Sequence, residues 1–349
     1  MSAYTVSPGE DKMGNTYLFM ALTQHPAEPL KLSMLEKSVE YGNIIAALIL
    51  ANIYAHGIEY NGEIILESNR DKAYEIYINV CENDDYGVSD WMIGFYFQNN
   101  LIKESNNCDD QTRLKTAYRY FLKSKDKGFP KAKNSLGKII SDNKLGFDPI
   151  KNEIEMIKYF EDASELGDNY ANINLGNFYL DRYFFEKRKE RLINAKEKFE
   201  TGAQMNSPEA LVKLGTIYIE FYNLDSDESY IKEAQRKFEL AVSFGTNQFS
   251  AAGYFLLGNL LKRYHDLINI DSLTKTLNQI KYEDLIIECH VRAYDIFNNL
   301  ISNGKTINGE NRRYFNILSQ SFKDIEINPL QFQLEAKAKK QQGSLPNTT

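Results

Sequence analysis

The chain has 349 residues, a formal net charge of −7 and an isoelectric point near 5.4. Hydrophobic residues make up 43% and aromatic residues 13% of the sequence, which is enough to build a core and excludes global disorder. The acidic balance excludes an overall attraction for a phosphate backbone, so no nucleic acid is expected as a partner.

Cysteine content and apolar runs bear on the compartment. Cys81, Cys108 and Cys289 are far apart and odd in number, which favours a reducing compartment over a disulfide framework. The first residues show no basic start followed by an apolar block, so we expect a cytoplasmic protein. The longest apolar run, residues 44–55, is too short for a membrane span and predicts a buried helix.

Along the chain, six segments share the pattern Ala, three residues, Leu-Gly, two residues and an aromatic or apolar residue. The pattern is clearest in "ANINLGNFYL" at residues 171–180. Its spacing places apolar and small residues on one face of an α-helix. The small residue of each copy is Ala51, Gly94, Gly137, Gly176, Gly215 or Gly258, at intervals of 43, 43, 39, 39 and 43 residues.

A second helical pattern accompanies each copy: a small or apolar residue, three residues, an aromatic, two residues and usually a small residue. The aromatics are Tyr77, Phe121, Phe160, Phe199, Phe238 and Phe297. Turn residues follow at Gly128, Gly167, Asn206, Gly245 and Gly304, with Asp84 in the weakest copy, and Gly or Asn can close a helix in the left-handed conformation. We expect the small residues to permit close helix packing, which offsets the cost of about 1 kcal/mol for a helical glycine. The aromatics are expected to fill gaps between neighbouring helix pairs.

Together the two patterns resemble the Sel-1-like repeats of the tetratricopeptide superfamily over residues 30–305. The resemblance implies an all-α fold, a right-handed α-solenoid of stacked antiparallel helix pairs. The second copy departs from the pattern, with Ser89 or Asp90 in place of Ala, and the last copy has a long connector from Leu267 to Ile280.

The expected organisation has four parts. Residues 1–29 form an N-terminal segment with a capping helix, residues 30–305 about six repeats, residues 306–329 a C-terminal capping helix, and residues 330–349 a polar, flexible tail. The connectors at residues 56–69, 99–112 and 222–229 are expected to be surface loops.

Catalytic and metal-binding patterns do not support an enzyme. None of the four histidines has zinc-hydrolase spacing, and neither a phosphate-binding glycine loop nor a nucleophile elbow occurs. The acidic run at Asp225 lacks the glycine and final glutamate of a calcium loop, because Arg236 stands at the twelfth position. We therefore expect no catalytic residue, no metal and no cofactor.

The resemblance implies a non-enzymatic adaptor or scaffold that binds a protein or peptide in a concave groove lined by the first helix of each pair. Asparagine amides there could bind an extended backbone, and Trp91 with Phe95 could form an aromatic anchor. The plain alternative is that these polar residues have no partner and that Trp91 only packs. The candidate groove residues are Asn52, Trp91, Phe95, Asn134, Lys138, Asn177, Thr216, Phe255 and Asn259.

Three other functions stay open. The first is an immunity protein that neutralises a cognate secreted toxin or effector, because an acidic solenoid suits a basic toxin and the richness in Asn, Ile, Lys and Tyr favours a bacterial source. The second is a peptide-sensing regulator, although only about 30 residues precede the array, too few for the DNA-binding domain of that class. The third is an enzyme whose site is built from scattered residues.

Overall fold

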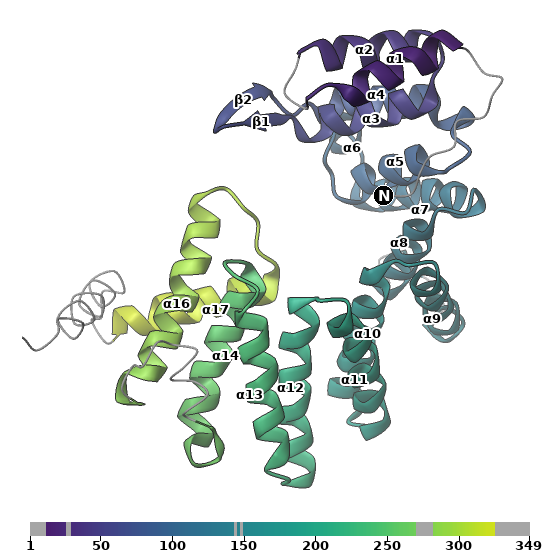
Figure 1. The fold of residues 1–349 in the computed structure, drawn as a ribbon. Helices are drawn as coiled ribbons and strands as arrows, with labels where there is room; N and C mark the ends of the chain where they lie inside the picture. Colours follow the sequence, from purple (N-terminus) through teal and green to yellow (C-terminus); the bar gives the residue numbers. More distant parts are fainter. Residues whose placement is uncertain (1–11, 26–28, 143–144, 147–148, 270–281, 325–349) are drawn as a thin grey trace, which may run out of the picture. The chain divides into compact units, whose positions relative to one another are not determined.

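The computed structural model describes residues 12–25, 29–142, 145–146, 149–269 and 282–324. The chain divides into two compact units, residues 1–174 and 175–349 (Figure 1). The predicted tail at residues 330–349, residues 1–11 of the predicted N-terminal segment and most of the predicted long connector, residues 270–281, lie outside the described residues.

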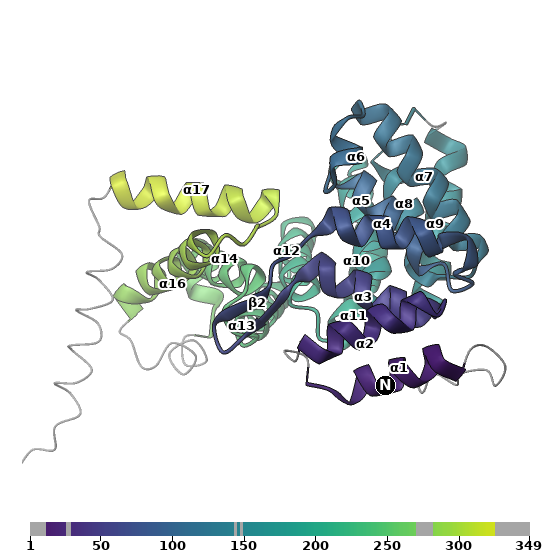
Figure 2. The ribbon, with the colours of Figure 1, turned by 90° about the horizontal axis from the view of Figure 1, so that it is seen from above.

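Unit 1 consists of consecutive helices that pair in chain order (Figures 1 and 2). Helix α1 packs on α2, α3 on α4, α5 on α7, and α8 on α9. The elements are α1 (Lys12–Thr23), α2 (Pro29–Glu40), α3 (Ile44–His56), β1 (Ile58–Tyr60), β2 (Glu63–Leu66), α4 (Arg70–Val80), η1 (Cys81–Asn83), α5 (Val88–Gln98), α6 (Lys103–Asn106), α7 (Asp110–Asp126), α8 (Pro130–Ser141) and α9 (Pro149–Glu165).

Unit 2 continues the same order of helix pairs. Helix α10 lies against α11 through Gly176 and Phe199, α12 packs on α13, and α14 on α16, with α17 against α14 and α16. Consecutive pairs meet through α11 on α12 and α13 on α14. Its elements are the last two-thirds of α10 (Asn169–Glu186), α11 (Lys189–Gln204), α12 (Pro208–Asp225), α13 (Ser229–Val242), α14 (Gln248–Tyr264), η2 (His265–Leu267), α16 (Tyr282–Ser302) and α17 (Gly309–Asp324). The predicted all-α fold of stacked helix pairs is confirmed.

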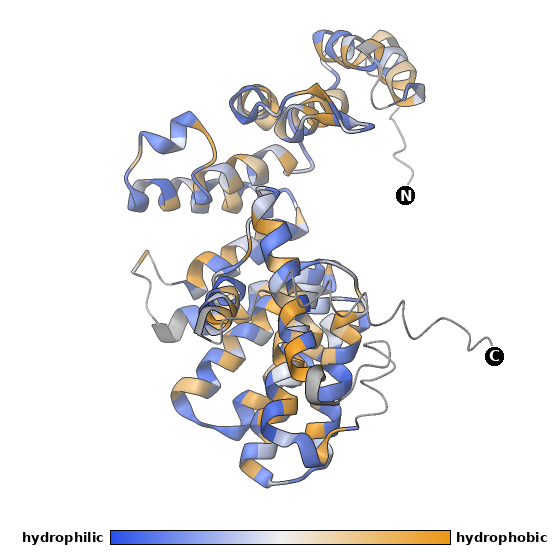
Figure 3. Cartoon of the chain, turned by 90° about the vertical axis from the view of Figure 1, so that its left-hand side faces the viewer, coloured by the Kyte–Doolittle hydropathy of each residue, from blue (hydrophilic) through white to orange (hydrophobic). Residues whose placement is uncertain are grey.

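The glycine of the Leu-Gly pair lies against the aromatic ring of its own partner helix. A Cβ atom would lie 2.6 Å from the Phe121 ring at Gly94, 2.8 Å from Phe160 at Gly137 and 3.0 Å from Phe199 at Gly176. The space is tightest at Gly215, against Phe238. The rings thus fill space inside each pair, a contact that the sequence period did not predict. Apolar residues concentrate where helices pack (Figure 3).

The last pair departs from this arrangement, because Gly258 faces the imidazole of His290. The predicted ring, Phe297, packs instead edge-on against Phe315 of α17, with ring centres 6.4 Å apart. His290 lies seven residues before Phe297, two turns away on the same face of α16. Burial, and secondarily the charge of Lys262, lower the pKa of His290 to about 4.

The predicted turns are confirmed in five copies. Left-handed φ angles occur at Gly128 (86°), Gly167 (90°), Asn206 (60°), Gly245 (89°) and Gly304 (70°). In the first copy the turn begins at Asp84, whose C=O accepts from Gly87 N at 3.4 Å, but Asp84 is extended, with φ −86°, and the left-handed residue is Gly87, with φ 71°. Because Gly87 takes the left-handed conformation, the Asp84 side chain can cap α5 instead.

Two of the predicted loops contain regular structure. Residues 56–69 hold an antiparallel hairpin of β1 and β2 in which Tyr60 pairs with Glu63. Asn61 and Gly62 have φ angles of 52° and 82°, as a type I′ turn requires. The connector at residues 99–112 contains the one-turn helix α6. The loop prediction is therefore wrong for the hairpin.

We predict that Gly215→Ala destabilises the protein by about 1–3 kcal/mol, because the new methyl group must displace the buried Phe238 ring. Gly309→Ala is the control, since no atom lies within 4 Å of its Cβ position. Urea unfolding followed by far-UV circular dichroism measures both. Equal midpoints for the two variants would show that the ring contact is loose.

We predict that acid destabilises unit 2 through His290. Its pKa is lowered from 6.5 to about 4 in the folded protein, so the folded state binds fewer protons than the unfolded chain. Stability therefore falls as the pH drops through this range, by roughly 2–3 kcal/mol from this residue. His290→Phe, which restores the ring of the other repeats, should flatten that part of the pH profile in urea unfolding. An unchanged profile would contradict this assignment.

Candidate binding surface

A cluster of aromatic side chains surrounds Trp91 on α5, the first helix of the second repeat. The Trp91 and Phe95 rings stack at 5.5 Å, and Phe129, next to the start of α8, lies 5.6 Å from Trp91. The Lys131 Nζ lies 5.2 Å from the centre of the Trp91 ring. Both α5 rings are only partly buried, so the group presents apolar surface beside a cation.

Trp91 also joins two repeats. Its indole Nε1 donates a hydrogen bond to the Ser135 Oγ of α8 at 2.9 Å. This bond fixes the ring orientation while the residue stays partly exposed. The sequence analysis found Trp91 and Phe95 but missed Phe129, Lys131 and Ser135. Pro130 marks the start of the next first helix, α8, so Phe129, Lys131 and Ser135 could have been placed near that start from the sequence.

Asn134 is engaged within the protein. Its Nδ2 donates to Asp168 Oδ2 at 3.0 Å, and its Oδ1 accepts from Asn174 Nδ2 at 2.8 Å. Asp168 is buried and also accepts from the Tyr170 backbone N–H at 3.0 Å. This amide ladder ties α8 to the start of α10 and leaves Asn134 little capacity for a ligand.

Other predicted residues are more available. Asn52, Lys138 and Asn259 are exposed and Asn177 is partly exposed. Within the described residues, the side chains of these four make no hydrogen bond. Thr216 donates from Oγ1 to Val212 O of its own helix at 3.2 Å.

Phe255 is covered by α17. Only 5% of it is exposed, and its ring stacks on Tyr314 at 4.6 Å and lies tilted against His290 at 5.7 Å. An ion pair between Lys213 of α12 and Glu310 of α17, at 2.5 Å, holds the helix in place. A partner would have to displace α17 to reach Phe255.

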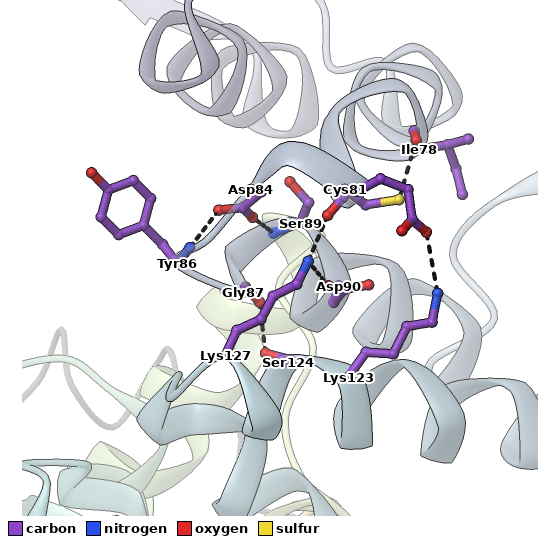
Figure 4. Close-up of polar contacts among 11 residues, drawn as sticks. Ile78, Cys81, Asp84, Tyr86, Gly87, Ser89, Asp90, Lys123, Ser124 and Lys127 are labelled. Atoms are coloured by element: carbon purple, nitrogen blue, oxygen red, sulfur yellow. Dashed lines mark hydrogen bonds and ion pairs between the residues drawn. The ribbon is translucent and has the colours of Figure 1, made fainter.

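A buried polar cluster lies where the first repeat (α3 and α4) meets the second (α5 and α7) (Figure 4). Asp84 accepts from the backbone N–H groups of Tyr86 at 3.0 Å and Ser89 at 2.6 Å, which caps α5. Lys127 Nζ donates to Asp90 Oδ2 and to Cys81 O, both at 2.6 Å. Ser89 and Asp90, the departures from the repeat pattern, thus belong to hydrogen bonds that hold the start of α5 to the end of α4 and to the end of α7.

The same cluster contains the residue types of a nucleophilic site, but the geometry favours structure. The Cys81 thiol donates to Ile78 O at 3.2 Å, and burial, with the Asp90 carboxylate, raises its pKa. The hydroxyl oxygen of Ser89 has no hydrogen-bond partner among the described residues, so no base activates it. Over the described ranges, no group of three or more His, Cys, Asp or Glu could hold a metal ion.

Comparison with known proteins identifies the fold. No protein-family model matches the chain, and no curated protein sequence matches it. The chain is similar to the solved structure of a protective antigen present in uropathogenic Escherichia coli strains that displays an SLR fold, with a TM-score of 0.56 and 18% identity. That likeness covers 97% of this chain and 64% of the antigen, so the chain spans about two-thirds of the antigen's length.

A second similar structure is a Sel1 repeat protein from Oxalobacter formigenes, with a TM-score of 0.54, 18% identity, and coverage of 79% of this chain and 98% of that protein. An immunity protein from Pseudomonas aeruginosa matches at a TM-score of 0.38 and 18% identity over 80% of this chain and 89% of its own. The last likeness is too loose to carry an argument. The first two show that the chain has the SLR fold, a solenoid of Sel1-like repeats.

No helix in the described part of the chain is long and apolar enough to cross a membrane.

We predict that Lys127→Met destabilises the protein by about 2–4 kcal/mol, because it leaves the buried Asp90 carboxylate without its partner. Lys123→Met is the matched control one turn earlier on α7, since its pair with Glu82 is exposed and worth less than about 0.5 kcal/mol. Urea unfolding compares the two. Similar losses would show that Asp90 does not depend on Lys127.

Proposed function

We propose that this protein is a non-enzymatic scaffold that binds a protein or peptide on the first helices of its repeats, in the cytoplasm. The partly exposed Trp91–Phe95 stack beside Lys131 carries the proposal. Aromatic groups of this kind, held rigid and partly desolvated, supply most of the affinity at protein interfaces.

The residues around the stack indicate the chemistry of the partner. Lys131 and Lys138 lie two turns apart on α8, on one face, and both are exposed. They would attract a carboxylate next to an apolar or aromatic side chain seated on Trp91. In unit 1 the amide of Asn52, and in unit 2 the amide of Asn177, could each donate to and accept from an extended backbone.

A scaffold of this kind can serve as an adaptor or as a dedicated inhibitor. The net charge of −7 favours a basic partner, as an immunity protein against a basic toxin would need. A one-to-one complex that abolishes the toxicity of a co-expressed neighbouring gene product would favour the inhibitor. Recovery of several partners in one assembly would favour the adaptor.

We predict that Trp91→Ala lowers partner recovery in an affinity pull-down with mass spectrometry by about tenfold or more, as loss of a hot-spot aromatic does. The double variant Trp91→Ala with Asn177→Ala should lose at least as much. Because Trp91 also bonds Ser135, Lys138→Glu is a second probe that breaks no contact within the described residues.

Lys115→Glu on α7 is the control, since it makes the same charge change at an exposed position of a second helix. Circular dichroism must show all variants folded. Equal recovery by Lys138→Glu, Lys115→Glu and the double variant would refute binding on the first helices and leave the fold unchanged.

A further inference from the structure

The hairpin of β1 and β2 stands out from the helices of unit 1 (Figure 1). Its base is fixed by backbone bonds from Gly57 N to Ile53 O at 2.8 Å and from Asn69 N to Tyr54 O at 2.6 Å. Gly57 has a φ of 72°, and a Cβ there would collide with Leu66 O. Any other residue at Gly57 would disturb the base. Gly57 and the two backbone bonds therefore fix the direction in which the hairpin leaves α3.

The hairpin has backbone groups available for a third strand. Tyr60 and Glu63 close a two-residue turn as a hydrogen-bonded pair, so the N–H and C=O groups of the next pair, Glu59 and Ile64, point away from the hairpin. Among the described residues, none outside the hairpin pairs with these groups. An open two-stranded edge is a template for strand addition.

Its side chains are apolar and exposed. Ile64 is 68% exposed, Tyr60 46% and Ile65 42%. The Tyr60 ring packs edge-on against His25, with ring centres 4.8 Å apart, and Leu66 packs on the core of unit 1. Ile64, on the opposite face of the hairpin from Tyr60, is the most exposed apolar side chain of the element.

Its charge is of one sign. Residues 57–69 contain Glu59, Glu63 and Glu67 and no lysine or arginine. All three glutamates are exposed, and none forms an ion pair within the described residues. Natural edges usually carry lysine against aggregation, whereas here the glutamates repel a second copy of the same hairpin.

We propose that β2 is a docking strand for an extended, basic segment of a partner protein, which adds beside Ile64 and places its cations against Glu63 and Glu67 at the two ends of the strand. The apolar side chains of the segment cover Ile64 and Ile65, and their backbones exchange hydrogen bonds. The bulge at Ile65 limits the pairing to a short segment. This site is separate from the surface around Trp91 and does not depend on it.

The test uses the full chain and an eight-residue peptide of alternating lysine and valine, with a glutamate–valine peptide and a lysine peptide interrupted by proline as comparisons. Calorimetry should show binding of the lysine–valine peptide alone, weakened by added salt. Glu63→Gln and Glu67→Gln combined should weaken it roughly tenfold, and Ile64→Thr, which keeps a strand-forming residue, severalfold.

Glu75→Gln on α4 and Ile154→Thr on α9, where Ile154 is 71% exposed, are matched controls that should leave binding unchanged. Trp91→Ala should also leave it unchanged, which separates this site from the proposed function. The proposal is overturned by absence of binding at millimolar peptide, by equal binding of the glutamate or proline peptide, by equal loss in the controls, or by dimerisation through the hairpin.

Discussion

The contact between a helical glycine and the ring of its partner helix sets the geometry of this protein. At Gly94, Gly137, Gly176 and Gly215 the missing side chain is replaced by a phenyl ring from the second helix of the same pair. The buried ring recovers the cost of placing glycine in a helix, because it removes a large apolar surface from water. With each pair closed on itself in this way, the outer faces of the first helices and the connectors are free to differ between repeats.

The period of the sequence predicted the helix pairs and five turns, because both follow from local patterns. It did not predict which helix each ring contacts, since periodicity places a residue on a face but does not name its neighbour. His290 shows the limit: Phe297 fits the pattern, but His290 is the residue that meets Gly258. The hairpin has a local signal, Asn61-Gly62 between apolar residues, which is weaker than the helical period on both sides of it.

The candidate surface was predictable in part for the same reason. Trp91 and Phe95 could be placed on one helix face, yet only the structure shows that Ser135 holds the indole and that Lys131 lies over it. Asn134 and Phe255 looked available because their partners, Asp168 and Tyr314, are 34 and 59 residues away in the sequence. Long-range partners decide whether a predicted residue is accessible, and a single sequence does not reveal them.

The departures from the repeat are therefore the informative positions. Asp90 breaks the pattern and forms the buried pair with Lys127, which the Gly87 turn makes possible. The first connector breaks it by forming a hairpin with acidic and apolar side chains. Positions that match the repeat pattern are explained by packing between helices. A departure that exposes apolar surface is not, and such surface usually marks an interaction site. The hairpin is such a departure, because it exposes Ile64 and adds only Leu66 to the core of unit 1.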